Sequence, residues 1–111
     1  MEVTATQFKH CDLIKTDGRV DSQSASRLAE VFDAIIEAGR FRIVLDMSEV
    51  DYISSAGLRV LIDAQKTCKR WSRGEVVLAG APKPVFEVLD MVGFVPLFKF
   101  FDDATLAVGS F

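Results

Sequence analysis

The chain is poor in the residues that build metal centres and catalytic triads. Its 111 residues include two cysteines and one histidine. Cys11 and Cys68 lie far apart in the sequence and form no Cys-x-x-Cys pair, so we expect no metal site, no cofactor and two buried free thiols. His10 stands alone beside an expected turn, and a lone histidine gives no basis for a Ser-His-Asp arrangement.

The phosphate-binding and nucleophile motifs of enzymes are also absent. The sequence contains no Gly-x-x-x-x-Gly-Lys-Ser/Thr loop, no Gly-x-Gly-x-x-Gly fingerprint and no Gly-x-Ser-x-Gly elbow. Ser55, the serine of most interest below, has no evident base near it in the sequence. A small nucleotide-binding or hydrolytic domain is therefore disfavoured, and we expect a protein that is not an enzyme.

No apolar run approaches the roughly 18 residues that a membrane-spanning helix needs. Residues 1–5 lack the basic and apolar regions of a signal peptide. The formal net charge is −3, which argues against nucleic-acid binding through bulk electrostatics. These features predict a cytoplasmic protein without a membrane span and without a direct nucleic-acid partner.

Half of the residues are hydrophobic, which is enough to build one hydrophobic core. With no linker, repeat or low-complexity tract, we expect a single domain over residues 1–111. Apolar periodicity predicts strands at 2–8, 13–16, 41–47, 75–79 and 97–101, and helices at 21–38, 55–71, 84–92 and 102–108. This order predicts an α/β domain with about four helices and a mixed, mostly parallel sheet of four to five strands, whose first two strands form an antiparallel hairpin.

Three local signals refine these boundaries. The pair Asp17-Gly18 is typical of a turn and is expected to close the second strand. Asp21 or Ser22 is expected to cap the first helix. The segment 48–53 is expected to be a loop that packs onto the sheet through Val50, Tyr52 and Ile53.

Two serines stand where the helix 55–71 should begin. Helix starts carry unpaired backbone N–H groups and about half a unit of positive charge, which serine caps well and which also favour a phosphate. Ser54 can therefore be only a helix cap, or the pair can be a functional site. Gly57 allows close approach of the helix to the sheet. The later part of this helix carries a basic excess that can be a solvated face or a partner contact.

The junction reads DYISSAGLRVL at 51–61 and is preceded by RIVLDMSEV at 42–50. These segments resemble the STAS domain, the sulfate-transporter and anti-sigma-factor-antagonist domain. Upstream, Gly-Arg-Val-Asp at 18–21 is similar to the family's glycine-x-x-aspartate turn, and downstream 86–94 is similar to its third helix and following turn. The resemblance covers nearly the whole chain and implies the same mixed α/β architecture.

Members of this family that act as anti-sigma factor antagonists are switched by phosphorylation of a serine in an aspartate-serine-x-glycine pattern. Aligned on Gly57, the acceptor is Ser55, with Ser54 as the less favoured acceptor, and Ser54 stands where the family has aspartate. The family's turn aspartate corresponds to Asp21, which the resemblance places near the acceptor. The expected partner-binding residues are Asp21, Ser54, Ser55, Gly57 and Arg59. Arg59 follows Ser55 by four residues, so we hypothesise that it pairs with a phosphate there; the alternative is an exposed arginine that only supports the helix.

The resemblance implies two partners: an anti-sigma factor that is also a serine kinase, and a PP2C-type phosphatase. The alternative is an unphosphorylated scaffold or accessory subunit of a transport complex, such as a lipid-transport machine, which the serine at position 54 favours. No oligomeric state is implied.

Overall fold

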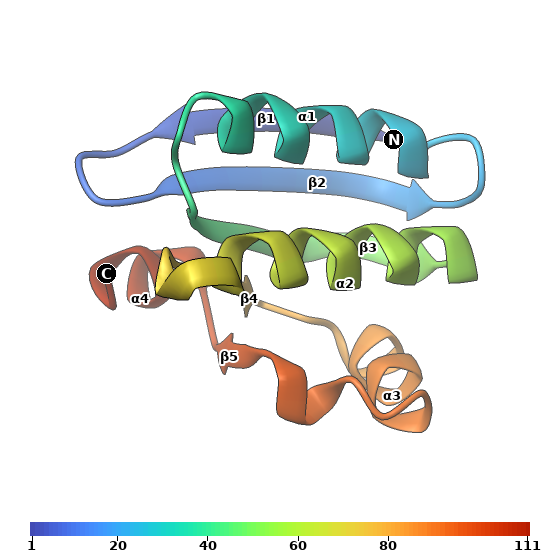
Figure 1. Cartoon of the computed structure of the whole chain (residues 1–111). Helices are drawn as coiled ribbons and strands as arrows, with labels where there is room; N and C mark the ends of the chain where they lie inside the picture. The colour runs from blue at the N-terminus through green and yellow to red at the C-terminus, as the bar shows by residue number, and fades with distance from the viewer.

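A five-stranded mixed sheet forms the centre of the domain (Figure 1). A computed structural model describes all of residues 1–111. The strands are β1 (Glu2–Gln7), β2 (Asp12–Val20), β3 (Arg42–Ile53), β4 (Glu75–Ala79) and β5 (Lys99–Phe101). They lie in the order β1-β2-β3-β4-β5, with β1 antiparallel to β2 and all other neighbours parallel. The predicted mixed, mostly parallel sheet is confirmed.

Helices cover the two faces of the sheet unequally. The helices are α1 (Ala25–Glu37), α2 (Ser55–Lys69), α3 (Lys83–Met91) and α4 (Ala104–Gly109), with short 3₁₀ turns at Arg70–Ser72 and Val95–Leu97. Helices α1, α2 and α3 contribute to the large core on one face, and Figure 1 shows α1 and α2 side by side. Only α4 packs on the other face, in a smaller apolar cluster. None of the helices combines the length and apolarity that crossing a bilayer requires.

The core follows directly from the periodicity of the elements. In α1 the buried side chains include Phe32 and Ile35, which recur at helical spacing on the face turned to the sheet. In β3 the side chains alternate, so Leu45 enters the large core while its neighbour Val44 points to the other face and packs with Ala107 of α4. A strand apolar on both faces is typical of a central parallel strand.

Strand β2 does not end at Asp17-Gly18, so the predicted turn there is wrong. The strand runs on to Val20, with shifts in register between Lys15 and Asp17 and between Gly18 and Arg19. Gly18 has a φ of +96°, a left-handed conformation that glycine adopts readily. The glycine therefore makes an irregularity inside a strand, as in a β-bulge, and the pairing with β3 continues past it.

Strand β3 correspondingly extends to Ile53, so the predicted loop at 48–53 is also wrong. The extension of β2 supplies a partner for this segment, because Val20 pairs with Ile53. Val50 and Ile53 are buried as expected, but Tyr52 is 41% exposed on the strand. The longer strands carry the start of α2 to the same edge of the sheet as the start of α1.

Candidate functional site

The ends of β2 and β3 bring Asp21 and Ser54 to the same edge of the sheet. Val20 and Ile53 are the last paired residues of these parallel strands. The backbone N–H of Ser54 donates a hydrogen bond to the carbonyl of Val20 at 2.8 Å, which joins the two strand ends. Two predicted site residues that are 33 positions apart in the sequence therefore stand beside one another in the fold.

Ser54 is the N-cap of α2, as the sequence predicts. Its backbone is extended, with φ −88° and ψ 173°, and its side-chain oxygen accepts a hydrogen bond from the N–H of Gly57 at 3.3 Å. Its carbonyl accepts the first bond of the helix, from the N–H of Leu58 at 2.9 Å. The hydroxyl of Ser54 is thus committed to the start of the helix.

Ser55 is the first residue of α2 and its side chain is exposed. Its hydroxyl makes no hydrogen bond within the chain, in contrast to that of Ser54. The hydroxyl stands at the positive end of the helix, where backbone N–H groups and the helix dipole favour an anion. A group attached to Ser55 would leave the cap intact.

Gly57 is the third residue of α2 and is buried against the sheet. A Cβ at this position would come within 2.8 Å of both Ile53 Cγ1 and Val20 Cγ1. Only glycine lets the first turn of α2 rest against the ends of β2 and β3. Gly57 therefore positions the two serines, and its place in a partner contact stays a prediction.

Asp21 caps the turn that leads into α1. Its Oδ1 accepts hydrogen bonds from the N–H groups of Gln23 (3.0 Å) and Ser24 (2.9 Å) and from the Ser24 hydroxyl (3.0 Å). These bonds, those from Ser24 first, hold the pKa of Asp21 below its usual value. The N–H of Ala25 donates to the Asp21 carbonyl at 2.9 Å. The N-cap of α1 is Ser24, so the cap predicted at Asp21 or Ser22 is wrong; Asp21 instead holds the turn that precedes the regular helix at Ala25.

Arg19 and Tyr52 form part of the rim of this site, which sequence reasoning missed. The two residues pair across β2 and β3, and the Arg19 guanidinium lies 4.3 Å from the centre of the Tyr52 ring. Arg19 precedes Asp21 by two positions, and Tyr52 precedes Ser54 by two positions. If the two strands had been expected to pair in parallel up to the site, these equal spacings would have placed Arg19 beside Tyr52. Arg59 is exposed one turn after Ser55 on α2 and forms no ion pair within the chain.

The site offers a free hydroxyl and a helix start, with no catalytic partner in contact. No residue hydrogen-bonds the Ser55 hydroxyl as a general base would. No group of three or more His, Cys, Asp or Glu side chains is arranged to hold a metal ion anywhere in the chain. The arrangement suits modification of Ser55 and contact with another protein.

These features define a small α/β module that presents the N-terminus of one helix at the edge of its sheet. The chain belongs to the STAS domain family, whose model matches residues 2–107. It is 36% identical over 111 residues to BtrV of Bordetella bronchiseptica, a protein described as a candidate anti-sigma factor antagonist. That match covers 100% of this chain and 95% of BtrV.

Solved structures show the same fold. A candidate anti-sigma factor antagonist of Thermotoga maritima has a TM-score of 0.88 at 21% identity, covering 97% of this chain and 92% of that one. The anti-sigma factor antagonist SpoIIAA in its unphosphorylated form has a TM-score of 0.84 at 13% identity, covering 98% and 95% of the two chains. SpoIIAA is also known in a phosphorylated form, with a TM-score of 0.78 at 12% identity over 98% of both chains.

Proposed function

We propose that this chain is an anti-sigma factor antagonist that is switched by phosphorylation of Ser55. In the unmodified state it binds an anti-sigma factor that is also a serine kinase, and this binding releases a sigma factor in the cytoplasm. The chain is the substrate of the kinase and performs no catalysis itself. Support comes from the similarity to BtrV along the whole chain and from the geometry of Ser55.

The single observation that carries this proposal is the contrast between the two serines. Ser55 is exposed with an unengaged hydroxyl, whereas the hydroxyl of Ser54 accepts the capping bond from Gly57. A kinase can reach the Ser55 hydroxyl without loosening α2. Ser55 is therefore the acceptor we propose, in preference to Ser54.

Serine in place of the family's aspartate at position 54 is compatible with this switch. Serine and aspartate are about equally good helix caps, so the start of α2 keeps its geometry. What the substitution removes is one negative charge beside the acceptor. Its effect should therefore fall on recognition by the kinase rather than on the fold of the site.

The physical effect of phosphorylation falls on the complex. A phosphoserine carries about −1.5 to −2 charges, which the N-terminus of α2 tolerates within the free protein. A partner packed over Asp21, Ser54 and Ser55 would instead meet a bulky dianion at a desolvated contact. A penalty of about 4 kcal/mol corresponds to roughly a thousandfold loss of affinity. A PP2C-type phosphatase would restore binding by removing the phosphate.

Arg59 is the residue that we propose to hold the phosphate in the modified protein. It is exposed, forms no ion pair and lies one turn beyond Ser55 on α2. Replacing Arg59 with alanine should change the phosphoserine NMR shift and speed dephosphorylation. Unchanged shifts and phosphatase sensitivity would contradict this role.

The test combines partner capture with phosphosite mapping in cells that express the full chain. The wild-type protein and the Ser55→Ala variant should capture the same kinase, and ATP with Mg²⁺ should release only the wild type. Mass spectrometry should then place phosphate on Ser55, and Ser54→Ala should leave phosphorylation in place. Phosphate on Ser54 alone would contradict the assignment of the acceptor.

A transport-complex subunit is the competing outcome of the same experiment. Capture of an ATPase with membrane components, with no kinase and no phosphate on either serine, would establish that function in place of the partner switch.

A further inference from the structure

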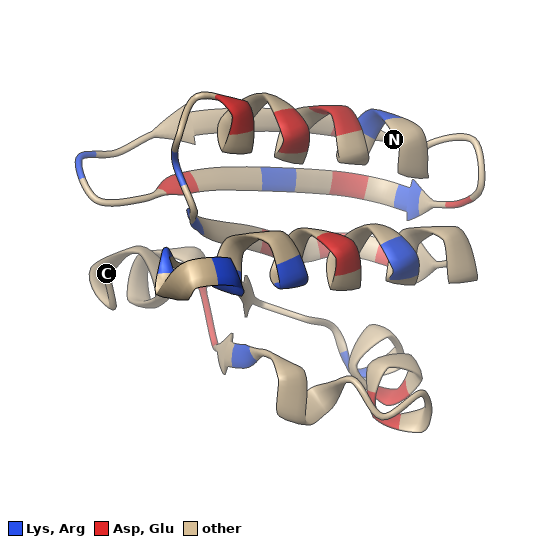
Figure 2. Ribbon diagram, in the orientation of Figure 1, with Lys and Arg blue, Asp and Glu red and all other residues tan.

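The end of the domain opposite Ser55 carries a concentration of cations. Figure 2 shows Lys and Arg segments gathered where α2 ends and where the β1–β2 and α1–β3 connections lie. The residues of this basic end are Lys9, Arg40, Arg42, Lys69, Arg70 and Arg73. They make up six of the 13 Lys and Arg residues in a chain whose net charge is −3. Positive charge is thus segregated to one end of an acidic protein.

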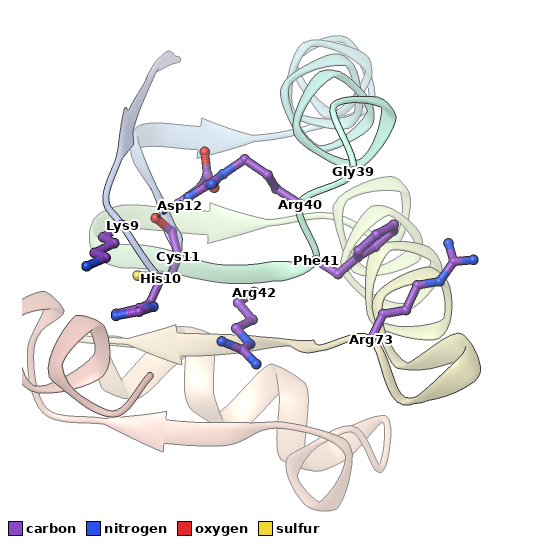
Figure 3. A pocket seen from close by; sticks show the side chains of 9 residues that line it. All are labelled: Lys9, His10, Cys11, Asp12, Gly39, Arg40, Phe41, Arg42 and Arg73. Carbon is purple, nitrogen blue, oxygen red and sulfur yellow. Dashed lines mark hydrogen bonds and ion pairs between the residues drawn. The ribbon is translucent and has the colours of Figure 1, made fainter.

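Arg40 belongs to the fold rather than to a free surface. Its guanidinium pairs with the carboxylate of Asp12 and donates to two backbone carbonyls of the β1–β2 connection. Figure 3 shows Arg40 directed at Asp12, with Arg42 and Arg73 pointing away from this pair. A second acid, Glu75, is bound by Lys99 at 3.2 Å. Asp12 and Glu75 are therefore already paired, whereas Glu37 at the end of α1 forms no ion pair.

The remaining cations form no ion pair, and all of them except Arg70 line one or both of two neighbouring hollows. Arg42, Lys69 and Arg73 line one polar hollow between the end of α2, the start of β4 and the last residues of the chain. Arg42 and Arg73 also line the adjoining hollow, together with His10. None of these cations forms an ion pair, and Arg73 lies 4.9 Å from the centre of the Phe41 ring. The two acidic side chains that line these hollows, Asp12 and Glu75, are bound by Arg40 and Lys99, so Arg42, Lys69 and Arg73 remain without an ion-pair partner.

Trp71 protrudes from the middle of these cations. Its side chain is 78% exposed, the most exposed aromatic residue of the chain, and it lies between Arg70 and Arg73. Trp71 and Ser72 both adopt left-handed backbone conformations, with φ of 62° and 56°. That conformation is rare for a bulky aromatic residue, and such strain gathers at binding sites. The fold thus keeps the Trp71 indole ring exposed to solvent.

We propose that Trp71 and the free cations Arg42, Lys69, Arg70 and Arg73 form a peripheral docking surface for the anionic headgroups of a phospholipid membrane. The argument is charge complementarity combined with a protruding amphipathic ring. Indole rings settle at the level of lipid headgroups, and Lys and Arg near a membrane are attracted to anionic lipids. The hollow lined by Arg42, Lys69 and Arg73 is placed to receive a lipid phosphate beside the inserted ring.

A nucleic-acid strand fits this surface less well. Sequence-tolerant binding of single strands uses successive aromatic platforms along a basic groove. Trp71 is the one aromatic side chain at this end that is more than half exposed, and it lines neither of the two hollows. One protruding ring among cations suits insertion into a planar headgroup layer.

The fluorescence of the intact chain provides a direct test, because Trp71 is its single tryptophan. Vesicles of phosphatidylcholine with about one-third phosphatidylglycerol should shift its emission to the blue and protect it from acrylamide. Pure phosphatidylcholine vesicles should do neither. Salt near 1 M should reverse the shift, since it reduces the screening length to about 3 Å.

Paired variants separate the docking surface from general charge. Arg42→Gln with Arg73→Gln should weaken vesicle partitioning on the order of tenfold or more. Lys15→Gln with Lys83→Gln removes the same charge from exposed positions elsewhere and should leave partitioning unchanged. Circular dichroism should show both double variants folded, because all four side chains are exposed and unpaired.

Several results would overturn the proposal. These are no shift with anionic vesicles at low salt, an equal shift with pure phosphatidylcholine, equal weakening by both double variants, or a stronger response to a single-stranded oligonucleotide than to vesicles. Ser55→Glu should leave partitioning unchanged, because the 15 residues of α2 place the two ends about 22 Å apart. Membrane docking and the partner switch can therefore fail independently.

Discussion

The side chain of Gln65 and the backbone of Val76 hydrogen-bond to each other in both directions. The N–H of Val76 donates to Gln65 Oε1 at 2.6 Å, and Gln65 Nε2 donates to the Val76 carbonyl at 3.0 Å. The same Nε2 also donates to the carbonyl of Leu97 at 2.8 Å. Because Gln65 is 3% exposed, one buried amide fastens the start of β4 and the 3₁₀ turn before β5 to helix α2.

Replacing Gln65 with leucine should be strongly destabilising. The change keeps the approximate volume but leaves the N–H and the carbonyl of Val76 buried without their partner. We expect a loss of about 2–4 kcal/mol in the free energy of unfolding, measured by urea denaturation. Gln23→Leu is the matched control, since Gln23 is exposed, and should change stability by about 0.5 kcal/mol or less. Equal effects of the two variants would contradict the role of the buried amide.

Replacing Gly57 with alanine should destabilise the fold although alanine favours helices. The added methyl group would lie 2.8 Å from both Val20 Cγ1 and Ile53 Cγ1, two buried side chains with little room to move. The overpacking should outweigh a propensity gain of about 1 kcal/mol and give a net loss of about 1–2 kcal/mol on thermal or urea unfolding.

The control for this variant is Gly109→Ala at the end of α4. A Cβ there would meet no atom within 4 Å, so this variant should be neutral or slightly stabilising. A Gly57→Ala protein as stable as the wild type would show that the start of α2 can move away from the sheet.

Asp21 should contribute to the loss of stability in acid. Hydrogen bonds from Ser24 lower the pKa of its carboxyl group in the folded chain, so folding favours the carboxylate. This contribution is complete above the unfolded value of about 3.8 and is lost as the pH falls through the lowered folded pKa. Asp21→Asn should therefore remove part of the decline in stability below that value, as measured by urea unfolding at several pH values.

An NMR titration of the Asp21 carboxyl carbon checks the cause. Ser24→Ala removes the hydroxyl donor and should raise the pKa of Asp21 part of the way to its usual value, since the N–H of residue 24 still donates. Ser26→Ala removes a hydroxyl that bonds the Gln23 carbonyl instead and should leave that pKa unchanged. Equal titration curves for the two variants would contradict this account.

The thiol of Cys68 should be nearly inert in the folded protein. Burial raises the pKa of Cys68 to about 11 from 9.0, so the thiolate is scarce near neutral pH. Alkylation at about pH 8, followed by peptide mapping, should modify Cys68 only after denaturation.

The same shift has a consequence for stability in alkali. The contribution of the protonated Cys68 thiol to the free energy of unfolding is complete below the unfolded pKa of 9.0. It is lost as the pH rises toward 11. Native Cys68 reacting as fast as in denaturant would show that the end of α2 opens readily.

Local sequence patterns were sufficient to predict the helices and strands whose apolar residues recur at regular spacing. The apolar residues of α1 recur at helical spacing, and the run in β3 is apolar on both faces, so type and position followed from periodicity. The boundaries that were missed depend on a neighbour. Asp17-Gly18 alone is typical of a turn. Only the pairing with β3 shows that Gly18 is an irregularity within β2.

The same division holds at the candidate site. The cap at Ser54 is local and was predicted. The close approach that Gly57 allows was also predicted, but its contact with Val20 follows only from the fold. The contact between Arg19 and Tyr52 depends on the register of two strands. The role of Gln65 depends on three backbone groups, two of Val76 and one of Leu97, that only the fold brings to α2. Phosphorylation of Ser55 stays a prediction that follows from the family resemblance and awaits measurement.

The strands of the sheet occupy space in the order in which they occur in the chain. During synthesis, each strand after β1 therefore leaves the ribosome when the strand beside it has already emerged. The nascent sheet can grow by one strand at a time from β1 toward β5, with α4 closing the second face last. Translation pauses within this chain should consequently expose a short edge of a growing sheet rather than an isolated strand without a partner.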